Sequence, residues 1–360
     1  MKTLYGWDYY CENILHCKEE YMVSLLDRKE ECYQSFKKEK KHGVRILWSI
    51  DKGSGLYLLQ KNLNKNFLLR IPLAMPAIGF VRGRSYQDYL RPHCGKRFHL
   101  RLDIQDFFGS ISERQVARSL EEFVQDQDII QNICDICMLE GSLPQGAVTS
   151  PALSNIVFRQ IDQRILKYCQ SIRKVRIGAE AKEEDIVYTR YADDMMFSSD
   201  YFDFGNQLSF YKMVKHILRE HGFRINHSKT YMTEGEISLS GFVIGTDVHL
   251  SRKRLREINQ ILAYFDKRKE ITGDAYEVDR RKIKDGDVLK RLNEERSERG
   301  FSRFINKKSC INYLCGYRAF LITFLKDNPE QTDSIKALEK KVRHLEQLIK
   351  QCQKIWFHIS

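Results

Sequence analysis

A pair of adjacent carboxylates, Asp193 and Asp194, lies within a strongly apolar stretch and constrains this chain more than any other feature. The flanking residues Ile186–Tyr188 and Met195–Phe197 are rich in side chains that favour β-strands, so the stretch predicts a β-hairpin with the acids at its tip. Two like charges at a hairpin tip repel each other, and a divalent cation that binds them removes this repulsion. The pattern therefore predicts a Mg²⁺ site at the tip of a hairpin.

A third carboxylate is expected from Asp103, which ends the short predicted strand Phe98–Asp103. The aromatic residues Phe107 and Phe108 follow it and are suited to form the floor of a nucleotide pocket. Three acids of this kind hold two metal ions that clamp the attacking and leaving oxygens of a phosphoryl transfer. The arrangement predicts phosphoryl transfer with two Mg²⁺ ions, whereas an Asp-Asp pair by itself is more often a solvated turn.

Three motifs in this order resemble the palm of a bacterial reverse transcriptase, of the retron and related phage-defence kind. They are Asp103–Phe108, Leu143–Gly146 and Tyr191–Asp194, and their combination is specific. The resemblance implies an α+β fold, the right-hand polymerase with fingers, a palm built on an antiparallel sheet and a helical thumb. It also implies DNA synthesis from dNTPs on an RNA template, a dedicated noncoding RNA, in defence against phage.

The resemblance implies roles for individual residues of the metal site. Asp103 and Asp193 are expected to be the shared metal ligands and Asp194 to support them, so all three are expected to be catalytic. Ile104 is expected to add its backbone carbonyl as a metal ligand. Lys229 matches the family's Asn-x-x-Lys-Thr element and is expected to protonate or electrostatically assist the leaving pyrophosphate.

Three residues are expected at the incoming nucleotide. By position, Arg45 resembles a basic fingers residue that meets the triphosphate; the alternative is a solvent-facing charge on a half-buried strand. Phe108 matches the family's aromatic gate, a ring under the sugar that rejects a ribose 2′-hydroxyl; the alternative is a core phenylalanine. The amide of Gln145, in the predicted turn Leu143–Gly146, is expected to reach the nascent base pair.

The charge of the chain points to an acidic partner. Its formal net charge is +12 and its pI is about 9.1, for which nucleic acid is the commonest partner. Arg82 and Arg84 lie on either side of Gly83, and Gly79 precedes them; these glycines allow close approach to a phosphodiester chain. A predicted helix with Ser251 as its N-cap opens with further bases, and a solvated helix face is the alternative to phosphate contact. These bases are Arg252, Lys253, Arg254 and Arg256.

The chain is predicted to have three parts. Residues 1–40 are expected to be an N-terminal helical segment, with one helix over 8–40, and residues 41–250 to be the fingers and palm. Residues 251–360 are expected to be a helical thumb with a solvated, charged insertion near 267–300. Apolar residues between Ile335 and Trp356 recur every three or four positions and predict a helix that packs on the thumb. The alternative is a seam for an effector protein or a second copy of the chain.

The cysteines and the N-terminus indicate a reducing cytoplasm and no membrane partner. Ten cysteines show no disulfide-like pattern, and there is neither a signal-peptide apolar core nor an apolar run of membrane length. Cys134 and Cys137 form half of a zinc-site pattern, with Cys310 and Cys315 as the other half. The first pair lies in an apolar helical pattern, where buried thiols simply pack, so packing is the favoured interpretation.

Two stretches depart from the retron pattern. In Tyr89–His93 only the histidine matches, and Leu239–Gly241 replaces a Val-Thr-Gly element. Competing hypotheses are a group II intron or diversity-element reverse transcriptase, and a catalytically idle RNA-binding scaffold. The three intact acids argue against the scaffold, because a protein that only binds has no reason to keep costly carboxylates together.

Overall fold

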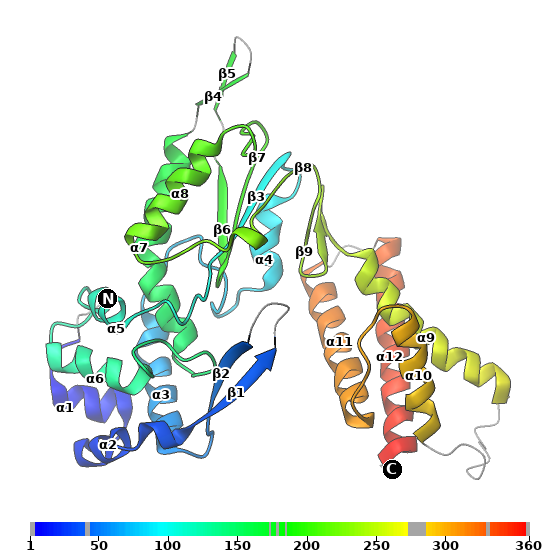
Figure 1. The fold of residues 1–360 in the computed structure, drawn as a ribbon, viewed down its shortest axis with the longest axis horizontal. Coiled ribbons are helices and arrows are strands. Elements are labelled where there is room, and N and C mark those ends of the chain that lie inside the picture. The colour runs from blue at the N-terminus through cyan, green and yellow to red at the C-terminus, as the bar shows by residue number, and fades with distance from the viewer. Residues whose placement is uncertain are drawn as a thin grey trace. The chain divides into compact units, whose positions relative to one another are not determined.

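The computed structural model describes residues 4–39, 44–172, 174–177, 180–183, 186–272, 286–328 and 332–357. The chain divides into two compact units, one of Met1–Ile237 with Ile244–Val248 and one of Ser238–Val243 with His249–Ser360. Both helices and antiparallel sheets are present (Figure 1), which confirms the predicted α+β class. No helix in the described ranges is both long and apolar enough to cross a membrane.

An antiparallel sheet of four strands forms the centre of the first unit. Its order is β6 (Val187–Tyr191), β7 (Asp194–Ser199), β3 (Phe98–Asp103) and β8 (Tyr231–Glu234). β6 and β7 are the predicted hairpin, turning at Ala192, whose φ is 56°. Because β3 pairs with β7, two segments far apart in sequence become neighbours in the sheet.

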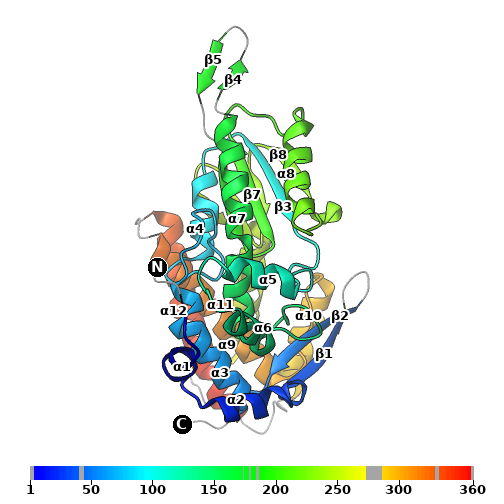
Figure 2. The same cartoon turned by 90° about the vertical axis from the view of Figure 1, so that its left-hand side faces the viewer.

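The two faces of this sheet differ because side chains alternate along each strand. One face carries Leu100, Leu102, Met195 and Phe197, all buried, and packs against helices α7 (Ser150–Ser171) and α8 (Leu208–Glu220). Figures 1 and 2 show both helices along this face. The opposite face carries Asp103, at the end of β3, and Asp194, at the start of β7.

Helix α7 is built as its sequence predicts. Pro151 lies in its first turn, where a missing N–H costs nothing, and apolar residues recur through it at helical spacing. Helix α3 (Gly55–Asn66) and α8 also carry buried apolar residues at helical spacing. Ser54 caps α3 by accepting a hydrogen bond from the Tyr57 N–H.

The predicted single helix over residues 8–40 is wrong. The chain instead forms α1 (Trp7–Tyr9), a π-helical turn (Tyr10–Leu15) and α2 (Glu19–Leu26). After a 3-10 turn (Lys29–Cys32), β1 (Tyr33–Glu39) pairs antiparallel with β2 (Val44–Ile50). The pairing with the β-prone β2 overrides the weak helical periodicity of Tyr33–Glu39, and His16 ends the π-helical turn in the left-handed region.

The remaining elements of the first unit are short. They are the 3-10 turn η3 (Leu68–Arg70), α4 (Tyr86–Leu90), η4 (Arg91–His93), α5 (Glu113–Leu120), α6 (Gln127–Cys137), β4 (Lys174–Ile177), β5 (Glu180–Glu183) and η5 (His227–Lys229). A three-stranded sheet lies where the chain passes between the units. Its strands are β9 (Ile237–Leu239), β10 (Phe242–Ile244) and β11 (Val248–Leu250).

The second unit is helical and consists of α9 (Arg252–Thr272), α10 (Gly286–Glu298), α11 (Lys307–Asp327) and α12 (Asp333–Phe357). The predicted apolar seam of α12 is buried by the unit's own helices, chiefly α11 and α9. The helix therefore packs within its unit, as expected, and this seam is not open to an effector or a second copy.

The charged insertion expected near 267–300 is only partly as predicted. Residues 273–285 lie outside the described residues, but 286–298 form α10, which buries Leu292 and Arg296. Arg296 donates to Glu257 over 2.9 Å, and its guanidinium lies 4.2 Å from the Phe304 ring centroid. The aliphatic chain and the planar guanidinium of Arg296 can thus pack in the core and hold a helix that has few apolar residues.

Candidate active site

The sheet brings Asp103 and Asp194 directly opposite each other. Asp103 ends β3, Asp194 begins β7, and the two are register partners in the antiparallel pair. Side chains at directly opposed positions point to the same face, with Cβ atoms about 5 Å apart. Asp193 lies in the turn next to them, and its carbonyl accepts a hydrogen bond of 3.0 Å from the Ile104 N–H. The three predicted acids are therefore gathered at one end of the sheet.

Each of the paired carboxylates is bound to a cation through one oxygen. Lys229 Nζ donates to Asp103 Oδ2 over 2.6 Å. Arg101 donates to Asp194 Oδ1 twice, from Nε over 2.9 Å and from Nη2 over 2.5 Å. Asp103 Oδ1 and Asp194 Oδ2 accept no hydrogen bond from the residues that the structure describes.

The carboxylates affect one another electrostatically. Burial raises the pKa of Asp194, the ion pair with Arg101 opposes the rise, and the charges of Asp193 and Asp103 add to it. Asp103 is almost completely buried, at 2% exposed, which strengthens these interactions. Three acids that act on one another electrostatically attract cations. A metal ion can therefore replace a basic side chain as their partner.

The donor set fits Mg²⁺. Carboxylate oxygens are the ligands this ion prefers, and it takes few of them, filling its shell with water and substrate phosphate. Asp103 and Asp194 each retain one oxygen for such an ion. Among the described residues, no group of three or more His, Cys, Asp or Glu side chains is arranged to hold a metal ion by itself. Two available carboxylate oxygens suit an ion that takes its other ligands from water and substrate.

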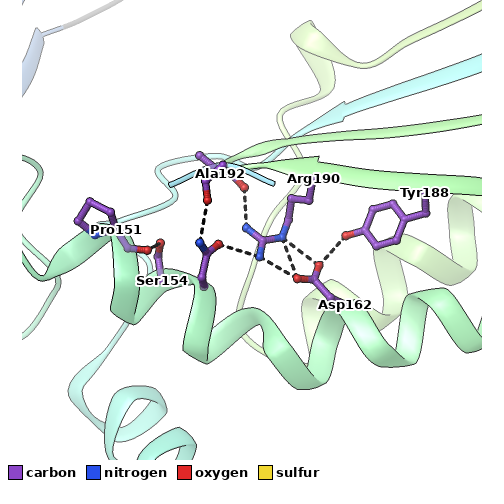
Figure 3. A network of polar contacts seen from close by, with 8 residues as sticks. Pro151, Ser154, Asp162, Tyr188, Arg190 and Ala192 are labelled. Atoms are coloured by element: carbon purple, nitrogen blue, oxygen red, sulfur yellow. Dashed lines mark hydrogen bonds and ion pairs between the residues drawn. The ribbon is translucent and has the colours of Figure 1, made fainter. Parts of the chain in front are cut away.

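A buried polar network holds the hairpin turn in place (Figure 3). Arg190 on β6 is fully buried and donates to Asp162 on α7 from Nε over 2.9 Å and from Nη2 over 2.7 Å. Its Nη1 reaches the Ala192 carbonyl over 3.1 Å, and the Tyr188 hydroxyl also donates to Asp162. Arg190 thus links helix α7 to Ala192, the residue that precedes Asp193 and Asp194.

The same network reaches the segment that carries Arg82 and Arg84. Asn155 accepts from Arg190 Nη2 over 3.0 Å and donates to the Gly79 carbonyl over 2.8 Å. A Cβ at Gly79 would lie 2.6 Å from the Ala192 nitrogen, so only glycine fits against the turn. Beyond it, Arg82 and Arg84 are exposed and make no ion pair with the described residues, as phosphate contacts require.

Phe108 lies in an aromatic cluster beside the hairpin. Its ring is half-buried, 5.3 Å from Phe107 and 6.2 Å from Phe80, measured between centroids. Phe107 is buried and belongs to the core, whereas Phe80 is 42% exposed, has a φ of 64° and also contacts Tyr191. Phe80 was not predicted to have a role, and its only local signal is its position after Gly79.

The predicted turn with Gln145 is joined to the β1–β2 hairpin. The Gln145 carbonyl accepts from the Trp48 N–H over 3.1 Å, and Gly146, at φ 122°, lies so close to the Trp48 carbonyl that a Cβ is excluded. Gln145 itself is half-buried. Arg45 is on β2, opposite Lys38, but its side chain lies outside the described residues.

The basic start of α9 is divided by its packing. Arg252, Lys253 and Arg256 are exposed, whereas Arg254 packs against the Phe320 ring, with 5.3 Å between its guanidinium carbon and the ring centroid. Ser251 accepts a hydrogen bond from the Arg254 N–H, which confirms the predicted N-cap. Three of the four bases are therefore available to phosphate without rearrangement.

His93, for which no role was predicted, links η4 to the sheet by hydrogen bonds. The hydroxyl of Thr189 donates to the Tyr89 carbonyl, so His93 Nε2 must be the donor in its 2.7 Å contact with Thr189. His93 Nδ1 then accepts from Ser198, also over 2.7 Å. Burial lowers the pKa of His93 to about 3, so this histidine is a neutral structural group.

The favoured alternative for the cysteines is the one found. Cys134 and Cys137 are buried in α6 among apolar side chains, and burial raises the pKa of each to about 12. A zinc ligand must be a thiolate, which this burial opposes.

Comparisons with known proteins agree with this geometry. Residues 52–267 match the family model described as reverse transcriptase (RNA-dependent DNA polymerase). The chain is 29% identical over 236 residues to the retron Ec86 reverse transcriptase of Escherichia coli, covering 63% of this chain and 68% of that protein. It is also 29% identical over 279 residues to the retron Mx65 reverse transcriptase of Myxococcus xanthus, covering 71% of this chain and 60% of that protein. The chain therefore belongs to the reverse transcriptase family, as an RNA-directed DNA polymerase of the bacterial retron type.

Proposed function

We propose that the site of polymerisation is the cluster of Asp103, Asp193 and Asp194, with two Mg²⁺ ions as cofactors. The observation that carries this proposal is the register of β3 against β7, which sets Asp103 opposite Asp194 beside the turn. When bound, Mg²⁺ neutralises the developing charge and aligns the attacking and leaving oxygens. The backbone carbonyl of Ile104 is assigned to the same ions as a further ligand.

Lys229 is assigned to the leaving pyrophosphate. Its Nζ lies 2.6 Å from Asp103 Oδ2, while its side chain is 52% exposed. A flexible, exposed ammonium next to the metal ligands can turn toward a phosphate and donate a proton or a hydrogen bond to it. The neighbouring backbone is fixed, because the Asn226 N–H donates to the Asp103 carbonyl over 2.8 Å.

The surrounding residues are assigned to the nucleotide and the nucleic acid. Phe108 is the proposed sugar gate, Gln145 is assigned to the nascent base pair, and Arg45 is assigned to the triphosphate of the dNTP. Arg82 and Arg84 are the proposed phosphate contacts of the first unit, and the exposed bases of α9 those of the second. In this division residues 41–250 are the fingers and palm, 251–360 the thumb, and 1–40 a supporting segment.

The biological proposal is that the enzyme copies a dedicated noncoding RNA into DNA in defence against phage, acting with an effector partner. It rests on the similarity to retron reverse transcriptases. The ten free cysteines are in keeping with a reducing cytoplasm. Sequencing the RNA and DNA that co-purify with the protein tests this directly. A single enriched RNA that is covalently linked or base-paired to its DNA copy supports the proposal, and random cellular RNA contradicts it.

The polymerase proposal is tested by primer extension on poly(rA)–oligo(dT) with Mg²⁺ and dTTP. The wild type is expected to extend the primer and Asp103→Asn to leave it unextended. An idle RNA-binding scaffold would bind the duplex and extend in neither case.

A further inference from the structure

Arg101 lies on the same face of β3 as Asp103, two positions earlier in the strand. Its register partner on β7 is Met196, so Asp194 is its diagonal neighbour across the pair. Diagonal positions are about 7–8 Å apart, a separation that a long side chain such as arginine spans. The strand that delivers one acid therefore also delivers a cation to another.

The hydrogen bonds made by Arg101 are unusual for an arginine–carboxylate pair. Such pairs are frequently bidentate, with one N–H for each oxygen. Here both N–H groups converge on Oδ1 of Asp194, over 2.9 Å and 2.5 Å. This geometry fixes the orientation of the carboxylate while leaving Oδ2 without a hydrogen bond from the described residues.

Arg101 is held more tightly than Lys229, the other cation of the site. Its side chain is 23% exposed and that of Asp194 is 17% exposed, whereas the Lys229 side chain is 52% exposed. A guanidinium is planar and presents its donors in a fixed fork, whereas an ammonium on a four-carbon stem turns freely. Lys229 can therefore move away from Asp103, whereas Arg101 is expected to remain bound to Asp194.

The tyrosines of α4, Tyr86 and Tyr89, lie near this ion pair. Tyr89 is fully buried, and its hydroxyl has no hydrogen-bond partner among the described residues. The phenol lies near enough to Asp194 and Arg101 for both charges to act on it. A buried hydroxyl without a partner marks a place that an additional ligand or water completes.

We propose that Arg101 is a positioning residue of the metal site: it locks Asp194 through Oδ1 so that Oδ2 faces a bound Mg²⁺ together with Asp103. This inference rests on the proposed function of the carboxylate cluster. Arg101 touches no substrate and no reacting atom in this assignment, and acts through Asp194 alone.

Charge and geometry make opposite predictions for the loss of Arg101. Removing a cation beside a metal site strengthens cation binding by Coulomb's law. Removing a group that orients a ligand weakens it, typically by about 10- to 100-fold for a residue outside the first coordination shell. The sign of the change therefore separates a positioning role from simple neutralisation of the acids.

The test is the affinity of the full chain, bound to a primer–template duplex, for Mn²⁺, followed by the electron paramagnetic resonance signal of the free ion. Arg101→Gln is expected to weaken Mn²⁺ binding about 10- to 100-fold. Arg101→Lys, which keeps the charge but not the fork, is expected to lie between Arg101→Gln and wild type. Arg97→Gln is the matched control, since Arg97 immediately precedes β3 and pairs with exposed Glu234 over 2.7 Å. It is expected to bind Mn²⁺ as the wild type does.

Unchanged or tighter Mn²⁺ binding in Arg101→Gln would overturn the positioning role. If that variant does not fold, Arg101→Lys decides, because wild-type affinity in it contradicts a need for the fork. Primer extension in the same samples separates this result from the proposed function. Absence of extension by a wild type that binds Mn²⁺ counts against the polymerase assignment alone. A wild type that binds no Mn²⁺ counts against both.

Discussion

At the scale of single residues, the site is a set of three acids, two of which are paired with basic side chains. Asp103 and Asp194 each share one oxygen with a basic side chain, Lys229 or Arg101. This arrangement lets like charges sit on facing strand positions of a folded protein before any metal arrives. Arg101 was missed in the sequence, although its spacing of two from Asp103 on a predicted strand already placed both on one face.

Phe108→Ala is expected to relax the choice between deoxyribose and ribose. The ring is half-buried between Phe107 and Phe80, so its removal opens space at the surface of the cluster without emptying the core. Incorporation of rGTP relative to dGTP in single-nucleotide extension measures the effect, and an increase of at least about tenfold is expected, equal to ~1.4 kcal/mol. Phe80→Ala is the neighbouring control; an unchanged ratio in Phe108→Ala means that its ring serves only the core.

His93 makes the stability of the protein depend on pH. The folded protein keeps it neutral down to a pKa of about 3, against 6.5 ordinarily, so below pH 6.5 the unfolded chain binds the extra proton. Stability contributed by this group is therefore complete above pH 6.5 and falls by about 1.4 kcal/mol per pH unit below it. Urea unfolding at pH 5 and 7 should show a smaller pH effect in His93→Gln than in wild type, and equal effects would contradict this account.

At the scale of elements, a helix or strand could be predicted when its own residues determine its structure. It could not be predicted when its structure depends on pairing with another segment. The β6–β7 hairpin and α12 were predicted because their apolar patterns are local to each segment. β1 was mistaken for helix, since its structure depends on pairing with β2. The order of the motifs indicated the acids of the site, but the Arg190–Asp162 pair depends on how α7 packs behind β6, which no spacing reveals.

The Arg190–Asp162 pair is expected to be the most costly buried contact to break. Both side chains are fully buried, and Asp162→Asn leaves the guanidinium without its counter-charge. Removing one partner of such a pair costs about 3–5 kcal/mol, measured as the free energy of unfolding. Glu234→Gln, which removes the exposed partner of Arg97, is the control and should cost at most about 1 kcal/mol. A comparable small loss in Asp162→Asn would show that the network does not hold the turn.

At the scale of the whole molecule, the net charge of +12 is expected to appear as salt-dependent RNA binding. Replacing Arg252, Lys253 and Arg256 together with Gln should weaken RNA binding across sequences and reduce the slope of log K against log salt by about one per lost contact. Arg254→Gln is the comparison, because Arg254 packs on Phe320. Filter binding at several salt concentrations measures the slope. An unaltered slope in the triple variant would assign these bases to a solvated face.

The central claim, that the cluster of Asp103, Asp193 and Asp194 is the site of polymerisation, is tested most directly by Asp193→Asn in single-nucleotide extension. The substitution removes one charge from the proposed metal site and none of the proposed phosphate contacts. RNA affinity should therefore remain near that of the wild type, while extension with Mg²⁺ is abolished. Extension within about tenfold of the wild type, or ~1.4 kcal/mol of barrier, would contradict the claim.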